Sequence, residues 1–90
     1  MNSKLYGIIS RSKMVIHNIA FITGKDSSDN NILRVIDLNN KNYVADFVYD
    51  NSIRRFNQVS STFANGKRKY EALYLVERNT EELLEACENS

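Results

Sequence analysis

Basic and aromatic side chains gather in the second half of the chain, in types that suit binding rather than bond making. Residues 51–69 hold five lysines and arginines and no acid. Such cations neutralise phosphates, and tyrosine rings stack on unpaired bases. The candidate binding residues are Arg11, Lys13, Arg54, Arg55, Lys67, Arg68, Lys69, Tyr70 and Tyr74. We expect them to form one patch on the folded protein.

Acidic residues elsewhere in the chain balance this charge. Residues 1–25 carry +4 and residues 51–69 carry +5, whereas residues 26–50 carry −3 and residues 70–90 carry −5. The net charge is +1 and the pI is about 7.8, below the value of about 9 that is typical of nucleic-acid-binding domains. Segregated charge of this kind favours a protein partner, with a nucleic acid as the alternative.

Candidate groups for covalent or acid–base catalysis are few. His17 is the single histidine and Cys87 is the single cysteine, which excludes an intramolecular disulfide. A histidine base and a thiolate nucleophile each need an activating neighbour, and the glutamates near Cys87 favour the neutral thiol. We expect both residues to be structural.

Carboxylates suggest a further alternative, a small metal-dependent hydrolase. Asp37 would share a magnesium ion with Asp46, Asp50 or Glu71, but no lysine follows Glu71 at the spacing such nucleases use. The three glycines are isolated, so no phosphate-binding loop or dinucleotide fingerprint is present. We therefore expect a protein that is not an enzyme and binds no metal and no cofactor.

Strands are expected in the first half of the chain. Leu5–Ser10 and Met14–Thr23 are rich in β-branched residues, although their isoleucines also fall near one helical face. Lys25–Asn31 is rich in Asp, Ser and Asn and predicts a loop. Ile32–Leu38 and Tyr43–Tyr49 flank four residues rich in asparagine, which predicts a hairpin.

Helical spacing appears next. The apolar stripe consists of Ile53, Phe56, Val59 and Phe63. The helix would be capped by Asp50, Asn51 or Ser52 and would end at Asn65-Gly66, with Lys67, Arg68 and Lys69 in the following turn.

The last elements are expected to be a strand and a helix. Tyr70–Glu77 has apolar residues on both alternating faces, which predicts a central strand. Asn79 or Thr80 would cap the helix after it. Its inward residues would be Leu83, Leu84 and Cys87.

These elements predict one α+β domain spanning residues 1–90. The expected architecture is an antiparallel curved sheet of about five strands with two short helices on one face, in the order β-β-β-β-α-β-α. A small β-barrel with appended helices is the alternative. The second face would then close into a barrel, pair with another copy or receive a partner. Tyr43, Phe47 and Tyr49 are the candidate residues for that contact.

The sequence thus predicts a non-catalytic interaction protein that binds a larger macromolecule and inhibits or regulates it. Twelve asparagines suggest an AT-rich coding sequence, which suits a phage or a mobile element. We expect a protein partner, a homodimer or higher oligomer, and no membrane segment. A single cysteine fits the reducing cytoplasm.

Overall fold

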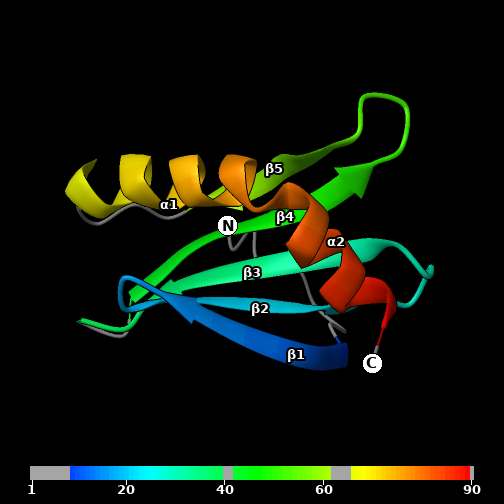
Figure 1. Cartoon of the computed structure of the whole chain (residues 1–90), viewed down its shortest axis with the longest axis horizontal. Helices are drawn as coiled ribbons and strands as arrows, with labels where there is room; N and C mark the ends of the chain where they lie inside the picture. The colour runs from blue at the N-terminus through cyan, green and yellow to red at the C-terminus, as the bar shows by residue number, and fades with distance from the viewer. Residues whose placement is uncertain (1–8, 40–41, 62–65, 90) are drawn as a thin grey trace.

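The computed structural model describes residues 9–39, 42–61 and 66–89. Five strands are followed by two helices in this part of the chain (Figure 1). They are β1 (Ile9–Ile16), β2 (Ile19–Lys25), β3 (Asn31–Asp37), β4 (Asn42–Asp50), β5 (Arg55–Ser61), α1 (Gly66–Arg78) and α2 (Thr80–Glu88). Consecutive strands pair antiparallel in the order β1-β2-β3-β4-β5. The α+β class is therefore confirmed, and the sheet is open rather than a barrel.

The order of the last elements is β-β-β-β-β-α-α, so the predicted β-β-β-β-α-β-α is wrong. β5 stands where a helix was predicted, because Asn57, Val59 and the serines after it are poor helix formers, and Asn57, Ser60 and Ser61 pair with β4. Val59 and Ile53 are 47% and 52% exposed, so helical spacing did not mark a buried stripe. Phe63 and Asn65, near the predicted helix end, lie outside the described residues.

α1 stands where a turn and a central strand were predicted. Its 13 residues are mostly Lys, Arg, Glu, Ala and Leu, which favour a helix, and a run of this length exceeds a typical strand. Ala72, Leu75 and Val76 share one helical face and are buried. Gly66 therefore opens a helix instead of ending one, and residues 67–69 form the first turn of α1.

The first hairpin turns at His17 and Asn18, in the middle of the segment predicted as one strand. Both residues have positive φ, 51° and 61°, as a two-residue type I′ turn requires. Met14–Thr23 is therefore divided between β1 and β2, while Leu5 to Ile8 lie outside the described residues. The loop after Lys25 and the β3–β4 hairpin match the prediction.

Three bulges in the described strands bend the sheet. The residues left without a cross-strand partner are Arg11 in β1, Val44 in β4 and Val59 in β5. A bulge adds local twist and re-aims side chains. Val44 and its neighbour Ala45 are accordingly both buried in the core.

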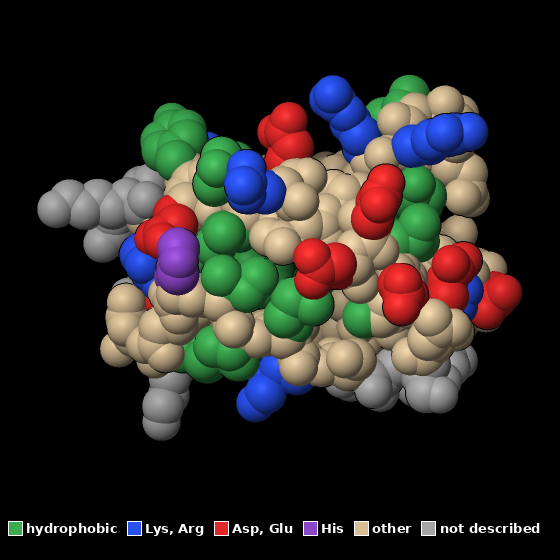
Figure 2. All heavy atoms as spheres, viewed as in Figure 1, with side chains coloured by type: hydrophobic (Ala, Val, Ile, Leu, Met, Phe, Trp, Pro, Cys, Tyr) green, Lys and Arg blue, Asp and Glu red, His purple; other side chains and the backbone are tan. Residues whose placement is uncertain are grey.

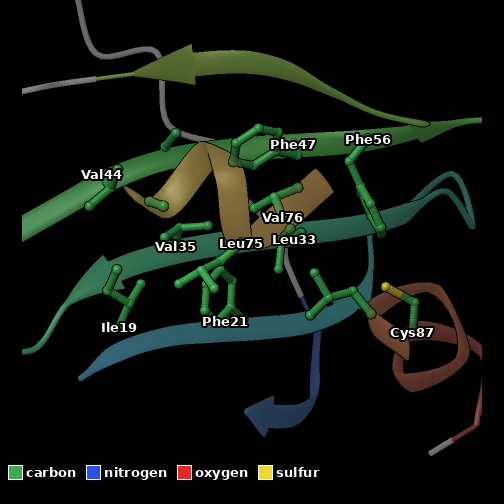
Figure 3. Packing of buried hydrophobic residues seen from close by; sticks show 13 residues of the cluster. Ile19, Phe21, Leu33, Val35, Val44, Phe47, Phe56, Leu75, Val76 and Cys87 are labelled. Atoms are coloured by element: carbon green, nitrogen blue, oxygen red, sulfur yellow. The ribbon is translucent and has the colours of Figure 1, made fainter. Parts of the chain in front are cut away.

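The hydrophobic core lies between the sheet and the two helices, which cover the same face (Figure 1). Figure 3 shows sheet residues such as Phe21, Leu33 and Val35 packed near Leu75 of α1 and Cys87 of α2. Leu83 and Cys87 are fully buried and Leu84 packs against the cluster, which confirms the predicted inner face of α2. Neither helix of the described chain has the length and apolar composition needed to cross a bilayer.

The opposite face of the sheet is closed to solvent at its centre. By strand alternation this face carries Ala20, Ile32 and Asp46, which are 1%, 0% and 0% exposed. The centre of this face is therefore buried within the chain, and a second copy or a partner on this face stays a prediction. Among the strand side chains that the structure describes, the exposed aliphatic ones lie at the edges, Val15 on β1 and Val59 on β5.

Candidate functional site

A tight turn positions β5 at the edge of the sheet. Oδ1 of Asp50 accepts hydrogen bonds from the Ser52 N–H (2.9 Å) and Oγ (2.6 Å). Oδ2 of Asp50 accepts one from the side-chain amide of Asn57 (3.2 Å). These hydrogen bonds, those from Ser52 foremost, lower the pKa of Asp50. The residues predicted to cap a helix thus form a side-chain-stabilised turn.

Two arginines follow this turn. Arg54 has a φ of 55° and Arg55 begins β5, and both side chains are exposed. Within the described residues, neither arginine forms an ion pair. The turn therefore presents two solvated cations at the start of the edge strand.

A groove runs along β5 beside the helices. Its inner hollow, of about 250 Å³, has a mixed lining of apolar and polar residues, which are Phe47, Phe56, Leu73, Val76, Arg55, Asn57, Gln58, Glu77 and Thr80. A second hollow, of about 460 Å³, adjoins it through Arg55, Glu77 and Thr80. This hollow extends to Arg54 and Arg78 and to the acidic residues Glu81 and Glu82. We call the two hollows together the β5 groove. A groove with mixed apolar and polar lining beside the edge of a sheet suits the binding of an extended peptide.

The two edges of the sheet differ in character. β1 carries Arg11 and Lys13, and charged residues on an edge discourage pairing with another strand. β5 carries no charge from Phe56 to Ser61 and no proline. Its outer backbone groups have no strand beside them in the described sheet. β5 is therefore the edge better suited to accept a further strand.

Arg68, a predicted binding residue, is held inside an ion-pair cluster. Its Nη1 donates to Glu71 (2.6 Å) and its Nη2 to the backbone carbonyl of His17 (2.7 Å). Its Nε lies 3.3 Å from Asp37 Oδ2, and Glu71 also accepts a hydrogen bond from His17 Nδ1 (3.0 Å). Arg68 thus ties the first turn of α1 to the β1–β2 turn and to the end of β3. We call these four residues the Arg68 cluster.

The predicted basic residues do not form one patch. In Figure 2, basic side chains over the β4–β5 turn lie far from the histidine side chain, which marks the Arg68 cluster. Arg55 shares a hollow with Arg78, which is separated from Arg68 by roughly 15 Å of helix. Lys13 projects from the sheet face opposite the helices. The side chains of Arg11 and Lys67 lie outside the described part of the chain.

The predicted aromatic residues lie in different parts of the structure. Tyr70 and Tyr74 are 71% and 59% exposed on α1, and Lys69 Nζ lies 5.7 Å from the centre of the Tyr70 ring. Phe47 is 3% exposed in the core, so it cannot serve as a surface contact. Tyr49 packs edge-on against Phe56, with ring centres 5.2 Å apart. The Tyr43 side chain lies outside the described part.

Of the carboxylates considered as metal ligands, Asp37 and Glu71 both contact Arg68, and Asp46 and Asp50 lie elsewhere. Asp46 pairs with Arg34 on one face of the sheet, Asp37 meets Arg68 at the end of β3, and Asp50 lies in the β4–β5 turn. Among the residues that the structure describes, no three His, Cys, Asp or Glu side chains are grouped to hold a metal ion.

Cys87 is buried in the core. Burial raises the pKa of its thiol, and Sγ donates a hydrogen bond to the Ile32 carbonyl (3.3 Å). A thiol in this state is a poor nucleophile. Cys87 therefore packs as a small apolar residue.

Sequence reasoning missed the β5 groove and the exposed residues Ile53 and Val59 of the β4–β5 hairpin. The signal that could have found them is Asp50-x-Ser52, a side-chain-stabilised turn pattern followed by residues that favour strands. Comparisons with protein-family models, with curated proteins and with solved structures find no match to this chain. The fold and site define an α+β protein with a five-stranded meander, two C-terminal helices and an open edge groove in its described part.

Proposed function

We propose that this chain is a non-catalytic interaction protein that binds a protein partner through the β5 edge and the β5 groove. The observation that carries this proposal is the combination of an edge strand that has no charged residue from Phe56 to Ser61 with a groove beside it that both apolar and polar residues line. Binding would act by occupying the surface of the partner and so inhibit or regulate it. A cytoplasmic location is part of this proposal.

Two exposed aliphatic side chains lie on the same hairpin, outside the β5 groove. Ile53 and Val59 lie on the β4–β5 hairpin and are 52% and 47% exposed, although burial of such side chains in a contact would be favourable. A nucleic acid is a weaker candidate, because Arg68 is engaged inside its cluster and Lys13 lies on another face. Arg54 and Arg55 alone leave a small cationic surface.

Affinity capture from a lysate of the source organism, read by quantitative mass spectrometry, tests the proposal with a matched pair of variants. Val59→Glu places a charge on β5, and Val15→Glu places one at a residue 49% exposed on β1. We expect the wild type and Val15→Glu to capture the same protein in similar amounts. Val59→Glu should capture at least tenfold less of it. Equal capture by both variants, or no protein captured by the wild type, would overturn the proposal. Circular dichroism verifies that both variants are folded.

A further inference from the structure

We draw no further inference here: the strongest candidate, the β5 edge with the β5 groove beside it, belongs to the site already described, and its charge selects no occupant because both arginines and glutamates line the larger hollow.

Discussion

Arg34 and Asp46 form a two-pronged ion pair across strands β3 and β4. Arg34 Nε donates to Oδ1 of Asp46 at 2.8 Å, and Nη2 donates to Oδ2 at 3.1 Å. The two residues are directly opposite in the strand register, and Asp46 is fully buried. A slip of one residue would separate this buried carboxylate from its guanidinium, so the pair helps to select the register of the central strands.

Removal of the Asp46 carboxylate should destabilise the folded protein. We expect Asp46→Ala to reduce the free energy of unfolding by about 3–5 kcal/mol, because Arg34 loses its buried counter-charge. The double variant Arg34→Met/Asp46→Leu should recover most of this loss, since an apolar pair has no charge to desolvate. Urea unfolding measures both. A double variant no more stable than Asp46→Ala would contradict this explanation.

The Arg68 cluster should contribute to stability. We expect Arg68→Ala to lower the free energy of unfolding by about 1.5–3 kcal/mol, because charged hydrogen bonds to Glu71 and to the His17 carbonyl are lost. Arg55→Ala is the matched control, with an expected change within about 0.5 kcal/mol because its side chain is exposed. Similar losses in the two variants would show that the cluster adds nothing to stability.

Phe56 and Val59 distinguish the observed strand from the predicted helix. Phe56 is 8% exposed and Val59 is 47% exposed. We expect Phe56→Ala to cost about 3 kcal/mol and Val59→Ala to cost less than about 0.5 kcal/mol in urea unfolding. Large losses in both variants would instead indicate a buried stripe shared by the two residues.

The β4–β5 turn should weaken in acid. The pKa of Asp50 is lowered by hydrogen bonds from Ser52, so its contribution to stability is present above the unfolded pKa of about 4 and is lost as the pH falls through the folded pKa. Asp50→Asn should thus be less stable than the wild type near neutral pH. The difference should close in strong acid, as measured by thermal unfolding at a series of pH values. A difference that does not change with pH would rule out this role for the charge.

Cys87 should be unreactive in the folded protein. Burial raises the pKa of the thiol and blocks access to Sγ. We expect Ellman's reagent to modify Cys87 at least a hundredfold more slowly in the native protein than in guanidinium chloride. Equal rates would show that α2 does not cover the thiol.

Local signals in the sequence were enough to predict the α+β class, the β3–β4 hairpin and the buried face of α2. The hairpin has an asparagine-rich connection between two apolar runs, and α2 has Leu83 and Cys87 one turn apart. Each of these signals depends on residues close together in the chain, where backbone preference and periodicity act directly.

Tertiary pairing decided the identity of β5, and with it the site, whereas the composition of α1 already favoured a helix. The spacing of Ile53, Phe56 and Val59 suits a helix, but pairing with β4 offered that segment hydrogen bonds that no local pattern reveals. Arg68 was likewise predicted to be a surface binding residue, but the fold places its guanidinium against Asp37 and the His17 carbonyl. Contacts between residues distant in sequence determine such outcomes, because their energies exceed the small differences in local propensity.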